Sequence, residues 1–88
     1  MHEVHNGLLV NISPEGAAVT LSVALEADQP VKFGVVLGSS KILAKAQVRH
    51  VQPAGTGFKI GIRFVEVDEH AREFLGGLYA SKVFRHNY

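Results

Sequence analysis

The chain lacks cysteine altogether and has no excess of charge of either sign. Nine Lys and Arg stand against eight Asp and Glu, which gives a net charge of +1. Without cysteine, disulfides and thiolate chemistry are excluded, and a reducing compartment is allowed. A charge so close to neutral provides no broad basic face for duplex nucleic acid, whose recognition depends on many phosphate contacts. An anionic ligand must therefore be small and held locally.

Long apolar runs and the marks of a leader peptide are also missing. No apolar run approaches the length needed to cross a bilayer. The first residues, Met-His-Glu-Val-His-Asn, have neither the basic region nor the apolar region of a secretory signal. We therefore expect a soluble, cytoplasmic protein with no membrane span.

The residues that are present suffice for one packed domain. Hydrophobic residues make up 47% of the 88 positions and charged residues only 19%, a balance typical of globular chains. A chain of this size buries roughly two-thirds of the surface that it exposes when unfolded. No repeat, linker or low-complexity tract divides it, so we expect a single domain over residues 1–88.

Alternating apolar and polar residues predict five strands separated by turn residues. In the first strand, Leu8, Val10 and Ile12 are expected on one face. The fourth carries Lys45, Gln47 and Arg49 on its outer face. The fifth follows period two most strictly and should be the best buried. The expected ranges are 7–12, 17–23, 31–37, 42–51 and 58–64.

The period changes to that of a helix at Asp68, which we expect to be the N-cap. The expected buried face comprises Ala71, Phe74, Leu75, Leu78 and Tyr79. Gly76 and Gly77 predict either close backbone packing or an early helix end. Five strands in antiparallel hairpin order and one helix indicate a mainly β fold, a small, partly open antiparallel barrel with a C-terminal α-helix.

Between the first two predicted strands lies the segment Asn-Ile-Ser-Pro-Glu-Gly, residues 11–16. Ser13, Pro14 and Gly16 suit positions i, i+1 and i+3 of a type I turn. Asn11 and Ser13 are two residues apart, so their side chains are expected on the same face as a small polar shelf. The alternative is that both side chains only bind the backbone of their own turn.

This segment resembles the motif of PilZ domains, which is Asp or Asn, any residue, Ser, any two residues, Gly. The resemblance continues through Gly-Ala-Ala-Val after the motif, Val-Arg-His-Val in the fourth strand and Gly-Phe-Lys-Ile-Gly-Ile-Arg-Phe before the helix. It implies a six-stranded β-barrel that binds cyclic di-GMP, a bacterial second messenger, on its outer surface. Asn11, Ser13 and Gly16 would then face the ligand.

One family feature is absent. Nucleotide-binding PilZ domains carry Arg-x-x-x-Arg upstream of the Asn motif, whereas the arginines here are Arg49, Arg63, Arg72 and Arg85. Losing two bidentate arginines removes about 3–6 kcal/mol of binding energy, at roughly 1.5–3 kcal/mol for each charge-assisted hydrogen bond. The ligand would have to recruit Arg49, His50 or Arg63, or arginines from a preceding domain or a second subunit.

The family's first strand also lacks a counterpart, so residues 7–12 correspond to its second strand. A barrel that lacks a strand exposes a sheet edge, and such edges are covered or paired with another chain. We therefore expect a homodimer or strand exchange.

Other chemistry finds little support. The histidines are His2, His5, His50, His70 and His86. They form no convincing metal set, and no nucleophile is paired with a base. We thus expect no metal, no cofactor and no enzyme.

The leading hypothesis is a PilZ-like regulatory module that binds cyclic di-GMP and signals through protein contacts. Its rivals are a degenerate PilZ-like adaptor that binds a partner protein without nucleotide and, less favoured, a single-stranded nucleic acid binder.

Overall fold

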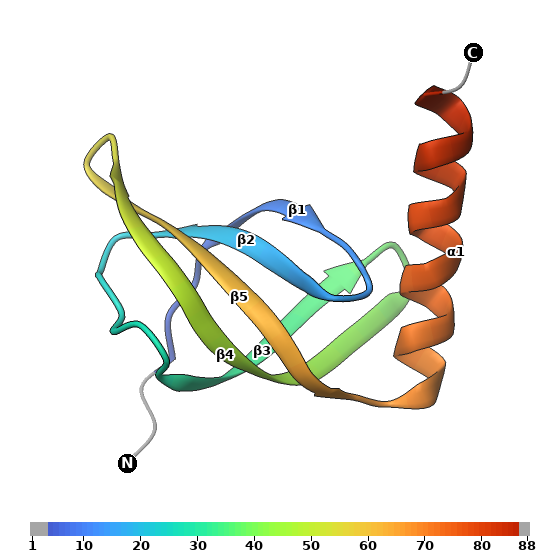
Figure 1. The fold of residues 1–88 in the computed structure, drawn as a ribbon, viewed down its shortest axis with the longest axis horizontal. Helices are drawn as coiled ribbons and strands as arrows, with labels where there is room; N and C mark the ends of the chain where they lie inside the picture. Colours follow the sequence, from blue (N-terminus) through green and yellow to red (C-terminus); the bar gives the residue numbers. More distant parts are fainter. Residues whose placement is uncertain (1–3, 87–88) are drawn as a thin grey trace.

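Five strands and one C-terminal helix make up the protein (Figure 1). The computed structural model describes the backbone of residues 4–86 and the side chains of residues 4–77. The elements are β1 (Leu8–Ile12), β2 (Gly16–Leu21), β3 (Pro30–Leu37), β4 (Ser40–Ala54), β5 (Gly57–Val67) and α1 (Glu69–His86). The predicted mainly β class with one C-terminal helix is therefore confirmed.

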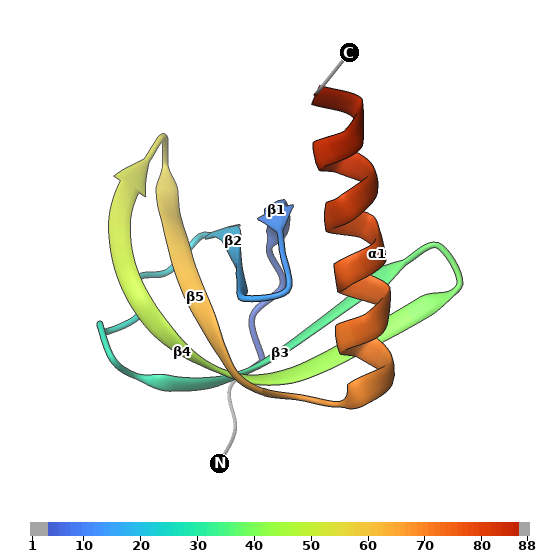
Figure 2. The same ribbon diagram turned by 45° about the vertical axis from the view of Figure 1, so that its right-hand side comes forward.

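The strands form one antiparallel sheet in the order β1-β2-β5-β4-β3. The predicted hairpin order fails between β2 and β3, which follow each other in the sequence but do not pair. Instead β2 pairs with β5, and β3 lies at the far edge of the sheet beyond β4. The connection between β2 and β3 is tied to β4: Asp28 N–H donates to Val48 O at 2.8 Å, and Val48 N–H donates to Gln29 O at 2.9 Å. The sheet curls into a half-barrel (Figure 2).

The core lies on the inner face of this curl, with β5 at its centre. Ile60 is fully buried, and Ile62 and Phe64 are 7% and 9% exposed. Phe33 reaches across from β3, with its ring centroid 5.5 Å from that of Phe64. The predicted period two holds for Ile60, Ile62 and Phe64, whereas Phe58 is only partly buried. The expectation that β5 is the best-buried strand is not confirmed, because β4 has four buried core residues, which are Ile42, Ala44, Ala46 and Val48.

The first strand does not alternate as predicted. Leu9 pairs with Val19 and Asn11 pairs with Ala18, so Val10 is the extra residue of a β-bulge. A bulge changes the side of the sheet on which the following residues lie. As a result Leu9 and Ile12 pack against the core, whereas Leu8 and Val10 are 75% and 49% exposed. The prediction that Leu8, Val10 and Ile12 share one face is therefore wrong.

The helix starts where the sequence indicates. The Asp68 carboxylate accepts a hydrogen bond from Ala71 N–H at 2.8 Å, which confirms the N-cap. Ala71 and Leu75 are buried in the core and Phe74 packs against it. The predicted contributions of Leu78 and Tyr79 lie outside the residues whose side chains are described.

Gly76 and Gly77 behave differently from both expectations. The helix continues through them to His86, so they do not end it. Apart from the helix's own nearby backbone, a Cβ built at either position meets no atom of the described residues within 4 Å, so close packing against the described part of the chain does not explain them either.

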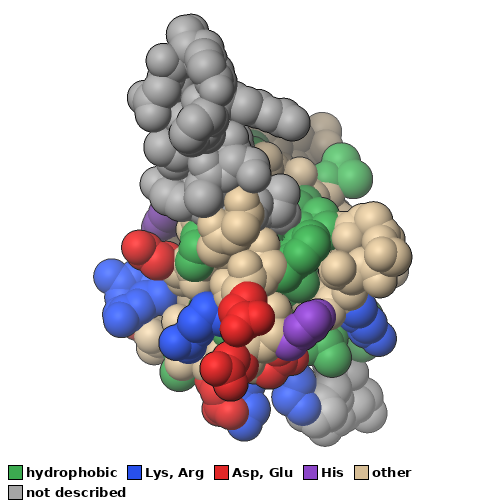
Figure 3. Space-filling model, turned by 90° about the vertical axis from the view of Figure 1, so that its right-hand side faces the viewer, with side chains coloured by type: hydrophobic (Ala, Val, Ile, Leu, Met, Phe, Trp, Pro, Cys, Tyr) green, Lys and Arg blue, Asp and Glu red, His purple; other side chains and the backbone are tan. Residues whose placement is uncertain are grey.

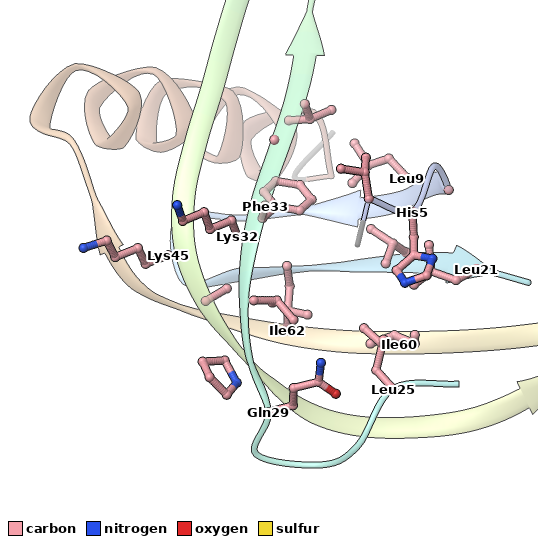
Figure 4. A pocket seen from close by; sticks show the side chains of 18 of the residues that line it. His5, Leu9, Leu21, Leu25, Gln29, Lys32, Phe33, Lys45, Ile60 and Ile62 are labelled. Carbon is pink, nitrogen blue, oxygen red and sulfur yellow. The ribbon is translucent and has the colours of Figure 1, made fainter. Parts of the chain in front are cut away.

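The curled sheet is open between its two edge strands, β1 and β3. A hollow of about 1080 Å³ lies there. Figure 4 shows that side chains of three strands, Leu9, Phe33 and Ile62, point into it. Within the described residues no helix is long and apolar enough to cross a membrane.

Candidate ligand-binding face

The segment that carries the Asn-x-Ser-x-x-Gly motif forms the hairpin between β1 and β2. Ser13 N–H donates to Gly16 O at 2.9 Å and closes the loop. The Ser13 hydroxyl accepts from Glu15 N–H at 3.3 Å and donates to Gly16 O at 3.5 Å. The Ser13 hydroxyl thus binds the backbone of its own turn, as the alternative interpretation of the sequence expected for both side chains. Asn11 is exposed, and its amide makes no hydrogen bond to any described residue.

Gly16 is required by the packing of the hairpin against β5. A Cβ at this position would collide with the carbonyl oxygen of Ile62 and lie 3.2 Å from the Arg63 Cα. The same approach lets Phe64 N–H donate to Glu15 O at 2.8 Å. The turn is thereby locked onto the neighbouring strand, and the motif glycine has a structural role that does not depend on any ligand.

Strand pairing brings four of the six predicted residues into two parallel rows on the outer face of the sheet. The first row crosses four strands through the pairs Asn11–Ala18, Ala18–Gly61 and Gly61–His50. Asn11 and His50 end this row three strand spacings apart, about 14 Å at roughly 4.8 Å per spacing. Between them lie only a methyl group and a glycine.

The second row lies beside the first and contains Arg63, one of the two arginines predicted for the site. Gly16 pairs with Arg63, and Arg63 pairs with Gln47. Arg63 is exposed, and no described acidic side chain lies within ion-pair distance of its guanidinium. The Arg63 charge is therefore available beside the hairpin that carries Ser13.

A second β-bulge determines how β4 contributes to this face. Val48 pairs with Ile62 and His50 pairs with Gly61, so Arg49 is the extra residue. Uninterrupted alternation would turn His50 toward the core, but the bulge leaves both Arg49 and His50 exposed. The bulge thus places two consecutive basic-type side chains on the outer face.

Further polar residues on this face were not singled out from the sequence. Lys59 pairs with Thr20 on one side and with Gln52 on the other, which makes a third row next to Gly61. Period two along β5 already places Lys59 on the face of Arg63, and this signal could have identified it. Its neighbours on other strands could not be read from local sequence.

The predicted outer stripe of β4 is mostly engaged by other groups. Lys45 Nζ lies 3.6 Å from the Glu66 carboxylate. Gln47 Nε2 donates to Asp28 O at 3.2 Å. Of the stripe, Arg49 is the residue left without a partner among the described side chains.

The hollow inside the half-barrel is a separate feature, because none of the predicted site residues lines it. No three described His, Asp or Glu side chains gather in a way that could hold a metal ion; His2 lies outside the described residues. On the face seen in Figure 3, acidic and basic side chains lie side by side. This mixture agrees with the near-zero net charge.

A curled antiparallel sheet with an Asn-x-Ser-x-x-Gly hairpin at one end and a helix after the last strand describes a recognisable class of domain. The PilZ domain family model matches residues 2–81. The chain belongs to the PilZ domain family. Searches of curated proteins and of solved structures found no significant match.

Proposed function

We propose that this PilZ domain is a regulatory, non-catalytic module of the bacterial cytoplasm that binds cyclic di-GMP on the outer face of β1, β2, β5 and β4. Binding changes a contact with a partner protein in signalling of the kind that governs motility, adhesion or biofilm formation. The single observation that carries the proposal is the double row of residues, with Asn11 and His50 ending one row and Gly16 and Arg63 adjacent in the next.

The shape of this face suits a flat ligand with charged edges. Ala18 leaves its part of the first row without a long side chain, and the His50 imidazole covers Gly61, so a purine ring can approach the sheet over Ala18, beside that imidazole. The Asn11 amide offers both a donor and an acceptor to a base edge. Arg63 and the bulged Arg49 supply the planar cations that phosphate prefers.

These two arginines take the place of the missing Arg-x-x-x-Arg pair. Both are exposed and neither has a described acidic partner. A ligand phosphate would therefore not have to displace an existing ion pair. Because the cations come from β4 and β5 and not from an upstream segment, we expect the nucleotide to lie over the strands, between the motif hairpin and the β4 bulge.

Calorimetric titration with cyclic di-GMP tests this arrangement. Arg63→Gln and Arg49→Gln should each weaken binding roughly ten- to a hundredfold, the equivalent of a lost charge-assisted hydrogen bond. Arg72→Gln is the matched control, because it removes the same charge from the exposed surface of α1. Wild-type protein that gives no heat at high micromolar nucleotide would refute the proposal.

A second candidate, an adaptor that binds a partner protein without nucleotide, is favoured by the hairpin itself. The Ser13 hydroxyl is used within the turn, and Gly16 is explained by packing against Ile62. Two of the three motif residues thus have structural roles. The adaptor predicts a silent titration together with a bacterial output that depends on the chain but is unchanged by Asn11→Ala combined with Arg63→Gln.

A further inference from the structure

The two edges of the sheet differ in how well they are protected. β1 has five residues and a bulge at Val10, and both features discourage pairing with another strand. β3 has eight residues and pairs with β4 along its whole length without a register shift. It is a long, regular edge with only one charged residue, Lys32.

The turn between β3 and β4 determines which backbone groups of β3 are free. Gly38 and Ser39 form a two-residue turn in which Gly38 has φ +63°, so Leu37 and Ser40 are a hydrogen-bonded pair. Because hydrogen-bonded pairs alternate along an antiparallel ladder, the N–H and C=O groups of Lys32, Gly34 and Val36 point away from β4. They form a row of unpaired donors and acceptors along the edge.

The inner face of β3 adds apolar surface beside this edge. The inward side chains are Val31, Phe33, Val35 and Leu37. All four are only partly buried, although each packs against the core. Three of them, Val31, Phe33 and Val35, line the open hollow, and Figure 4 shows Phe33 pointing into it. A strand laid against β3 would cover them and satisfy the edge groups at the same time.

We propose that the occupant of this edge is β3 of a second copy of the chain, paired antiparallel about a two-fold axis at Gly34. This register faces Phe33 with Val35 of the other copy and Val31 with Leu37, so inward apolar side chains meet inward apolar side chains. On the outer face Lys32 meets Val36 of the other copy. The two half-barrels become one continuous sheet.

Charge selects this register over its neighbours. An axis at Lys32 would place the two lysines directly opposite each other, which destabilises a sheet. An axis at Phe33 would place them on a diagonal, about 7–8 Å apart. The axis at Gly34 separates them by four positions and keeps most of the eight-residue strand paired.

The register makes opposite predictions for two substitutions at one exposed site. Val36 is 65% exposed and faces Lys32 of the other copy. Val36→Lys should therefore weaken dimerisation roughly tenfold, through two symmetry-related like-charge contacts, whereas Val36→Glu should maintain or tighten it. Val65→Lys and Val65→Glu are the controls, since Val65 is 67% exposed on β5, two strands in from the edge. Sedimentation equilibrium gives the dissociation constants.

Val36 also faces Lys41 within its own chain, so thermal unfolding must show that each variant is folded.

A second measurement avoids this site. The chain has no cysteine, and Gly34→Cys places two thiols on the axis, where a short bifunctional reagent should join them; Leu43→Cys should not be joined. A wild-type chain that stays monomeric at high micromolar concentration, equal effects of Lys and Glu at position 36, or equal cross-linking at positions 34 and 43 would overturn the proposal. Neither assay uses cyclic di-GMP, so its result does not depend on whether the chain binds that ligand.

Discussion

The imidazole of His50 fills the space that a side chain at Gly61 would occupy. A Cβ at position 61 would collide with His50 Cε1 and lie 2.6 Å from Nε2 and 3.0 Å from Nδ1. The two residues are direct neighbours across β4 and β5, at the end of the row that begins at Asn11. Gly61 therefore sets the position of His50 on the proposed ligand face.

Gly61→Ala should move the His50 ring without unfolding the protein. The atoms in the way belong to the far end of the exposed His50 side chain, which can rotate. In a strand, alanine is more stable than glycine by about 0.5–1 kcal/mol. We expect the free energy of unfolding to stay within about 1 kcal/mol of wild type. The His50 ring resonances in an NMR spectrum should shift clearly. Unchanged resonances would contradict this description of the site.

Gly16→Ala should behave very differently, although it is the same chemical change. The obstacle here is the backbone carbonyl oxygen of Ile62, which can move only if β2 and β5 separate. Overpacking of this kind costs typically about 1–3 kcal/mol. Urea denaturation of Gly16→Ala and Gly61→Ala side by side measures the contrast. Equal stability of the two variants would show that the hairpin yields more easily than its contacts indicate.

Much of the fold could be predicted because it depends on local patterns. Ile60, Ile62 and Phe64 are buried at period two as expected, although Phe58 is only partly buried, and the change of period at Asp68 coincides with the start of α1. Alternation failed at Val10 and Arg49, where bulges insert an extra residue. Each bulge is a feature of how its strand pairs with the neighbouring strand, β1 with β2 and β4 with β5, so the alternation within a single strand does not announce it.

The arrangement of the candidate site depends on the pairing between strands. The motif identified Asn11, Ser13 and Gly16, yet it did not reveal that the Ser13 hydroxyl binds its own turn. The register that aligns Asn11 with His50 passes through β2 and β5 and exists only once the sheet has formed. The sequence thus supplies candidates for the site, and the strand pairing decides which of them become neighbours.

Removing the cap of α1 should weaken the attachment of the helix to the sheet. The Asp68 carboxylate accepts from Ala71 N–H at 2.8 Å, and Ala71 itself is 4% exposed. Asp68→Ala should lower the free energy of unfolding by about 1 kcal/mol. Asp68→Asn is the control, because asparagine caps about as well. An equal loss in both variants would assign the effect to charge and not to the cap.

Two substitutions within α1 should instead stabilise the protein. Gly76 and Gly77 lie inside the helix, and neither has a positive φ. Apart from the helix's own nearby backbone, no atom of the described residues lies within 4 Å of a Cβ built at either position. Replacing each with alanine removes the entropic disadvantage of glycine, about 0.5–1 kcal/mol per residue. Gly76→Ala and Gly77→Ala should therefore each raise the urea midpoint with an unchanged slope. A lower midpoint would mean that the helix packs there against a surface that needs glycine, such as another copy of the chain or a partner protein.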